Sequence, residues 1–100
     1  MSSLKETLVQ ALRGYTGKAF NGESYLTTSE DGQRFVVISI STANGKRIVN
    51  AGLVVQIAND LIIIDKDINN KMLVNALLQA GIARDQIILA YAGESIPQKA

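Results

Sequence analysis

The sequence predicts an α+β domain: an antiparallel meander sheet of about five strands with two helices packed on one face, in the order α-β-β-β-β-α-β. Two apolar stripes at helical spacing lie near the two ends of the chain, and β-branched runs separated by tight-turn dipeptides lie between them. Because 47% of the 100 residues are hydrophobic, residues 1–100 suffice for one core in a single domain without a disulfide or metal.

The first helix is predicted to begin at a capping box. Ser3 and Glu6 are spaced so that the Ser3 hydroxyl accepts a hydrogen bond from the Glu6 amide, while the Glu6 carboxylate accepts one from the Ser3 amide. The apolar stripe that follows comprises Leu4, Leu8, Ala11, Leu12 and Tyr15. Gly14 or Gly17 is expected to end the helix in a left-handed conformation.

Four antiparallel strands are expected next, because three dipeptides favour the positive φ angles of tight hairpin turns. These dipeptides are Asp31-Gly32, Asn44-Gly45 and Asn59-Asp60. The strands they delimit are Ser24–Ser29, Arg34–Ser41, Arg47–Ile57 and Leu61–Asp65. Gly52 predicts a bulge or bend within the long third strand.

The second helix is predicted to start at Asp67, whose carboxylate can cap an early amide, and to run to about Ala80. Its buried face is expected to comprise Met72, Leu73, Ala76, Leu77 and Ala80. Gly81 then ends the helix, and a final short strand covers 87–91. Residues 93–100, with the one proline at Pro97, are expected to form a loose tail.

The composition argues against most enzyme classes. The chain has no His, the commonest general base, and no Cys for a disulfide or a thiolate zinc site. Its start turns polar at once, unlike a signal peptide or membrane span. We therefore expect a non-enzymatic, cytoplasmic protein with no cofactor, no metal, no catalytic residue and no membrane partner.

An alternative function is a small Mg²⁺-, Mn²⁺- or phosphate-dependent enzyme using Asp60, Asp65 and Asp67. These carboxylates cluster near one turn and one strand end, and oxygen ligands are those that Mg²⁺ prefers. The same pattern also fits ordinary structural tasks, since Asp65 ends a strand and Asp67 caps a helix.

Direct nucleic-acid binding is left open by the basic pair Lys46 and Arg47, which follows a hairpin turn and could contact a phosphate or an acidic partner. A net charge of +1 without a basic stripe disfavours tight nonspecific DNA binding by one copy. Basic residues also protect exposed strands from aggregation.

The two runs 61–64 and 87–89 are apolar at every position, so both faces of those strands need cover. With two helices on one face, the second face predicts a homo-oligomer, with a dimer favoured. The expected interface residues are Leu61, Ile63, Ile87, Leu89 and Tyr91. The alternatives are helices split between the faces, or strands central in a strongly coiled sheet.

An ordered set of patterns resembles the XisI-like family, the fdxN-element excision controlling factors best known from cyanobacteria. The set comprises a first helix ending near Tyr15, the strand 34–40, the stretch Lys46-Arg47-Ile48 with 52–57, and the run 80–89, AGIARDQIIL. The resemblance implies an accessory protein for programmed DNA excision, acting beside a site-specific recombinase and a second small factor, XisH. It implies no catalytic residue.

Overall fold

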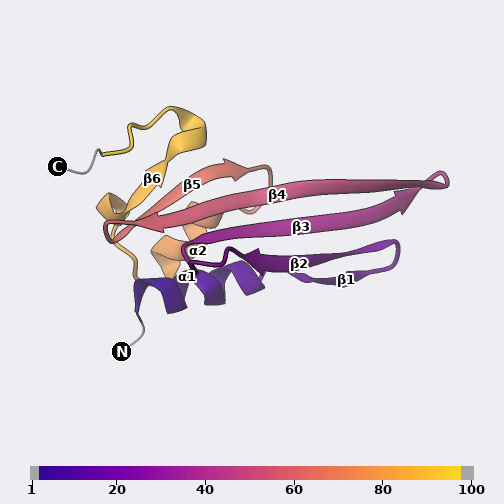
Figure 1. Cartoon of the computed structure of the whole chain (residues 1–100), viewed down its shortest axis with the longest axis horizontal. Helices are drawn as coiled ribbons and strands as arrows, with labels where there is room; N and C mark the ends of the chain where they lie inside the picture. The colour runs from indigo at the N-terminus through magenta and orange to yellow at the C-terminus, as the bar shows by residue number, and fades with distance from the viewer. Residues whose placement is uncertain (1–2, 98–100) are drawn as a thin grey trace.

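One sheet runs the length of the computed structural model, which describes residues 3–97 (Figure 1). Its six strands lie in chain order. They are β1 (Gly17–Ala19), β2 (Gly22–Thr28), β3 (Arg34–Ala43), β4 (Lys46–Ala58), β5 (Leu61–Asp67) and β6 (Ile87–Leu89). β1 to β5 form an antiparallel meander, and β6 lies parallel to β5 after a crossover through a helix.

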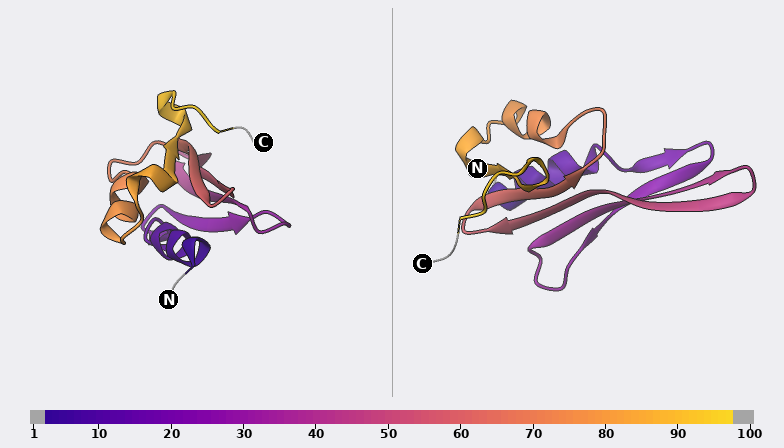
Figure 2. Two further views of the ribbon diagram at one scale, coloured as in Figure 1. Left: turned by 90° about the vertical axis from the view of Figure 1, so that its left-hand side faces the viewer. Right: turned by 90° about the horizontal axis from the view of Figure 1, so that it is seen from above.

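Two α-helices, α1 (Leu4–Arg13) and α2 (Leu73–Gln79), pack on one face of the sheet as predicted (Figure 2). Two short 3-10 helices follow, η1 (Arg84–Gln86) and η2 (Ala90–Ala92). The helices and strands share one buried core, which comprises Leu8, Leu12, Phe35, Val37, Leu53, Val55, Ile62, Ile64, Leu73, Leu77 and Ile87. Neither described α-helix has the length and apolar run that a membrane crossing requires.

Most of the local signals that predicted this order are present in the structure; at Asp31-Gly32 only the glycine has a positive φ, so that turn is not the primed turn predicted. The capping box of Ser3 and Glu6 starts α1. The Asn44-Gly45 and Asn59-Asp60 turns have both residues at positive φ, between 52° and 75°, as primed hairpin turns require. Gly52 is the unpaired residue of a bulge, because Val37 pairs with Leu53 while Ile38 pairs with Ala51.

The strand count and one strand direction differ from the prediction. A sixth strand, β1, pairs with β2 through a short turn, although residues 17–19 have no β-branched or aromatic side chain. β6 is parallel to its neighbour, so the sheet is not antiparallel throughout. The right-handed φ of −66° at Gly14 also shows that α1 ends without the expected left-handed residue there.

The second helix begins later than predicted. α2 starts at Leu73 with Met72 as its N-cap residue, and Asp67 instead completes β5 by pairing with Leu53. The capping role of Asp67 is nevertheless retained across the loop, because its Oδ2 accepts a hydrogen bond from the Leu73 amide at 2.7 Å. Asp67, which the sequence predicted as the cap of this helix, therefore caps α2 from six positions before its first residue.

Half of the sheet extends beyond the helices. The molecule measures 50 × 29 × 27 Å, and both α-helices lie over one half of its long axis (Figure 1). We call the projecting half the arm; it consists of residues 17–25 and 38–51, with the Asn44-Gly45 turn at its tip. The arm has no helix on either face, so its side chains meet only strand neighbours and solvent.

Candidate functional site

The residues predicted to form an interface on β5 and β6 do not form an exposed patch. Ile87 is 1% exposed within the core, and Leu89 packs against that core. Ile63 lies on the opposite face, outside the core cluster, yet it is only 2% exposed. Leu61 is partly buried, which leaves Tyr91, 37% exposed, as the most accessible of the five.

The chain itself covers the second face of β5. The 3-10 helix η2 follows β6 directly and contacts β5. Because η2 follows the last strand and touches β5, we attribute the burial of Ile63 to this C-terminal segment. Ile63 is therefore shielded within a single copy of the chain. Self-association of the chain stays a prediction.

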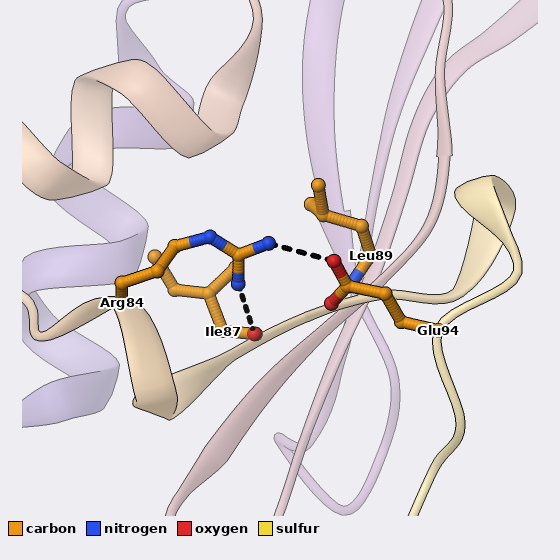
Figure 3. Close-up of polar contacts among 4 residues, drawn as sticks. All are labelled: Arg84, Ile87, Leu89 and Glu94. Atoms are coloured by element: carbon orange, nitrogen blue, oxygen red, sulfur yellow. Dashed lines mark hydrogen bonds and ion pairs between the residues drawn. The ribbon is translucent and has the colours of Figure 1, made fainter.

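An ion pair anchors the C-terminal segment (Figure 3). Arg84 donates one hydrogen bond to the carbonyl oxygen of Ile87 at 2.8 Å and another to Glu94 Oε2 at 2.7 Å. The second oxygen of Glu94 accepts a hydrogen bond from the Leu89 amide at 2.9 Å. The loose tail predicted from Gly93 therefore does not begin there, because Glu94 is fixed to β6; residues 98–100 of that prediction lie outside the described part of the chain.

We expect this anchor to loosen in acid. The hydrogen bond from the Leu89 amide, followed by the hydrogen bond from Arg84, holds the pKa of Glu94 below its usual value of 4.5. A carboxylate with a depressed pKa stabilises the fold fully above its unfolded value and loses that contribution as the pH falls through the folded value. An NMR titration should show the Leu89 amide shift changing below pH 4.5. Glu94→Gln should abolish that change, and a Leu89 midpoint at or above 4.5 in the unmodified chain would contradict the anchor.

The structure does not assemble the three carboxylates proposed for a metal-dependent enzyme. Asp60 lies in the turn before β5 and Asp67 ends that strand, so the two are separated by roughly 20 Å of extended chain. Asp65 is the unpaired residue of a bulge and accepts a hydrogen bond from Gln56 at 3.0 Å. Within residues 3–97 no three acidic, His or Cys side chains gather as a metal site would need.

Asp67 is committed to structure. Its two oxygens accept hydrogen bonds from the Leu73 amide, the Asn69 amide at 3.0 Å and the Asn69 side chain at 2.9 Å. Nearby, the hydroxyl of Tyr15 donates to the Lys71 carbonyl at 2.6 Å, and burial, with the charge of Asp67 second, raises the pKa of that tyrosine. These contacts order the loop between β5 and α2 and fasten it to the end of α1.

A groove of about 490 Å³ lies between the two α-helices. It is lined by small and amide side chains together with Glu6 and Lys71. Glu6 is already occupied by the capping box, in which it accepts from the Ser3 amide at 3.2 Å. Besides this committed carboxylate, the groove presents the ammonium group of Lys71 and the hydroxyl of Thr7.

The basic pair Lys46 and Arg47 lies at the start of β4, beside the tip of the arm, and both residues are exposed. Paired positions share a face of the sheet, so Arg47 lies on the face of Thr42 and Lys46 on the face of Ala43. The two basic side chains therefore point to opposite faces of the hairpin.

The sequence reasoning missed an apolar surface on the arm. Tyr25, Ile38, Ile40 and Val49 share the face turned away from the helices. The signal was present, because residues 35–38 are apolar at four consecutive positions, as residues 61–64 are. In β5 the inner side of that pattern faces the helices and the outer side is shielded, whereas in β3 the outer side stays partly exposed.

Comparison with known proteins identifies the family of this chain. The family model described as XisI protein matches residues 2–99. The chain belongs to the XisI family. A search of curated proteins gives no match.

Two solved structures share the fold of this XisI-family chain. One is the fdxN element excision controlling factor XisI from Anabaena variabilis ATCC 29413, with a TM-score of 0.66 and 23% identity over 87% of this chain and 88% of that one. The other is a XisI-like protein from the same organism, with a TM-score of 0.66 and 15% identity over 86% of this chain and 78% of that one. At these identities the likeness establishes the fold.

Two of the segments that carried the resemblance to the XisI family lie in different parts of the structure. Lys46-Arg47-Ile48 begins β4 at the tip of the arm. The run 80–89 follows α2 through η1 and β6 and contains Arg84, which holds the C-terminal segment. The second segment therefore has a structural explanation, whereas the first is exposed to solvent.

Proposed function

We propose that this XisI-family protein is a non-catalytic accessory factor that assists site-specific DNA excision by a recombinase, in the cytoplasm, by contacting other proteins. The observation that carries the proposal is the family match over residues 2–99. It is supported by the printed name of a solved structure with the same fold, an excision controlling factor.

The distribution of side chains agrees with a binding role. The carboxylates that might have served catalysis are dispersed or committed to hydrogen bonds. Large hydrophobic side chains are instead exposed on the arm, where a partner can reach them. The partners in this proposal are an XisH-like protein and the site-specific recombinase.

The test is reconstitution of excision from defined components. The chain is co-expressed with an XisH-like protein and a recombinase encoded in the same genome, and a reporter measures the joined product across the excised element. The expected results are co-purification of the chain with at least one of the two proteins and a rise in excision when the chain is present. Unchanged excision together with no complex would contradict the proposal.

A matched variant separates accessory binding from metal-dependent catalysis. Asp60→Asn, which tolerates the positive φ of that turn, combined with Asp65→Ala removes two of the three candidate carboxylates and leaves Asp67, which the fold requires. An accessory protein keeps its support of excision in this variant. Loss of support, together with a heat of Mg²⁺ or Mn²⁺ binding in the unmodified chain that the variant lacks, would favour the enzyme.

A further inference from the structure

The two faces of the arm have opposite character. On the face that continues from the helix-covered core, the arm carries Ser24, Ser39, Ser41 and Asn50 together with one exposed apolar residue, Ile48, and the first two hydroxyls are 2.9 Å apart. The face turned away from the helices carries the apolar set Tyr25, Ile38, Ile40, Val49 and Ala51. We call this second side the outer face of the arm; it is the side of the sheet opposite the two α-helices.

The outer face is exposed as well as apolar. Val49 is 58% exposed and Tyr25 is 41% exposed. Of the eight large hydrophobic residues exposed in residues 3–97, four lie on the arm: Tyr25 and Val49 on the outer face, Phe20 between β1 and β2, and Ile48 on the opposite face, where it pairs with Ser41. Exposed apolar side chains that lie together mark interaction sites, so the outer face has the composition of a contact surface.

The shape of the outer face favours another sheet as its occupant. The three strands contribute residues 22–25, 38–43 and 46–51 to this face; with a spacing of about 4.8 Å and a rise of about 3.3 Å per residue they cover on the order of 250 Å². Flat β-faces pack well on flat β-faces, with the sheets about 10 Å apart. This area is smaller than that of stable complexes, so the contact predicts a weak dimer, in the micromolar range, rather than an obligate one.

Charges beside the apolar set supply the argument for a second copy of the same chain. Glu23 lies on β2, at one side of the outer face, where it pairs with Ile40. Arg47 lies on β4, at the other side, where it pairs with Thr42 two positions before Val49. Neither forms an ion pair in the single copy, since the one ion pair within residues 3–97 joins Arg84 and Glu94; Lys18 of β1 lies beside Glu23 at the paired position. In a two-fold contact residue i of one copy meets residue j of the other and the reverse, so these opposite charges can form two equivalent pairs.

We propose that the outer face of the arm is the contact surface of a two-fold homodimer, with the apolar sets packed together and Glu23 of each copy beside Arg47 of the other. The inference goes beyond the accessory role proposed above and does not depend on it. It replaces the β5 and β6 surface by one whose side chains are accessible in the single copy.

Sedimentation equilibrium of the purified full chain, from about 1 to 200 μM, measures the dimer directly. The unmodified chain should dimerise with a micromolar Kd. Val49→Glu on the outer face should raise Kd at least about tenfold, because the contact would bury a charge. Asn50→Glu, at the next position of β4 on the opposite face, should leave Kd within about twofold. Tyr25→Ser is a second outer-face variant, and circular dichroism confirms that each variant is folded.

A charge exchange identifies the occupant. Glu23→Arg alone, or Arg47→Glu alone, should raise Kd several-fold by placing like charges together, about three- to tenfold each. The two substitutions in one chain should return Kd to within about threefold of the unmodified value, because both reciprocal pairs are restored with their signs reversed. Only contact between copies of the same chain predicts this rescue.

Several outcomes would overturn the inference. A strictly monomeric chain across the whole concentration range would remove it, and so would a dimer unaffected by Val49→Glu. Equal weakening by Val49→Glu and Asn50→Glu would indicate pairing along the free edge of β4 instead. A monomeric chain whose outer face binds only an XisH-like protein or recombinase would leave the accessory role intact and overturn the second copy as occupant.

Discussion

Replacement of Ile63 by Ala is expected to lower the free energy of unfolding by about 2–5 kcal/mol, as truncation of a fully buried aliphatic side chain does. Ile63 is 2% exposed although it lies on the face without α-helices. The loss would arise from a cavity under the C-terminal segment that covers β5. Urea denaturation followed by far-UV circular dichroism measures the change.

The control is Val49→Ala, which truncates an aliphatic residue on the same face of the sheet but in the open arm. Since Val49 is 58% exposed, its truncation in the monomer should change the unfolding free energy by less than about 0.5 kcal/mol. The comparison is made at low concentration so that self-association does not contribute. Equal small losses for the two variants would show that the C-terminal segment does not shield Ile63.

Replacement of Asp67 by Ala is expected to cost about 2–4 kcal/mol, because hydrogen bonds to a charged group are lost and a buried donor is left unsatisfied. The Leu73 amide, in a buried setting, donates to Asp67 at 2.7 Å, and Asn69 donates to the same carboxylate twice. Without these acceptors α2 loses its cap and the preceding loop loses its order. Equilibrium denaturation gives the magnitude, and hydrogen exchange at the Leu73 amide locates it.

Asp65→Ala is the matched control for Asp67. It removes a carboxylate two positions earlier that is exposed and accepts a single hydrogen bond, from Gln56. Its expected cost is below about 0.5 kcal/mol. If both variants lost the same amount, the capping role that we assign to Asp67 across the loop would be wrong.

The parts of the fold that depend on a few neighbouring residues were predictable from the sequence. The Asn44-Gly45 and Asn59-Asp60 turns follow from the tolerance of their residues for positive φ, and Gly52 follows from the geometry of a bulge. The capping box of α1 is likewise local. These features predict the succession of α1, β3, β4 and β5 from residues that are neighbours in the sequence.

The features that depend on distant contacts were not predictable in the same way. β1 forms because residues 17–19 follow a short turn next to β2, and their own side chains give no strand signal. The start of α2 was placed early because Asp67 carries a cap signal, while its backbone is held in β5 by pairing with Leu53. Pairing in the sheet outweighed the local preference for a helix.

The candidate site shows the same limit. An apolar run such as 61–64 states that both faces of a strand need cover, without stating what provides it. We attribute the cover over Ile63 to the C-terminal segment about 30 positions later; η2 in that segment contacts β5, and its sequence Ala-Tyr-Ala has no helical or strand period. The run 35–38 in β3 has no such cover on its outer side. Both runs are apolar at four consecutive positions, so only their places in the folded sheet distinguish them.

The parallel placement of β6 has a consequence for the order in which the chain assembles. Each strand from β2 to β5 pairs with the strand before it in the chain, so these hairpins can form in sequence through short loop closures as the chain leaves the ribosome. β6 must wait for α2 to cross the sheet before it can align with β5. Until then the outer edge of β5 remains open, and the nascent polypeptide is most vulnerable to misassembly just before its last strand arrives.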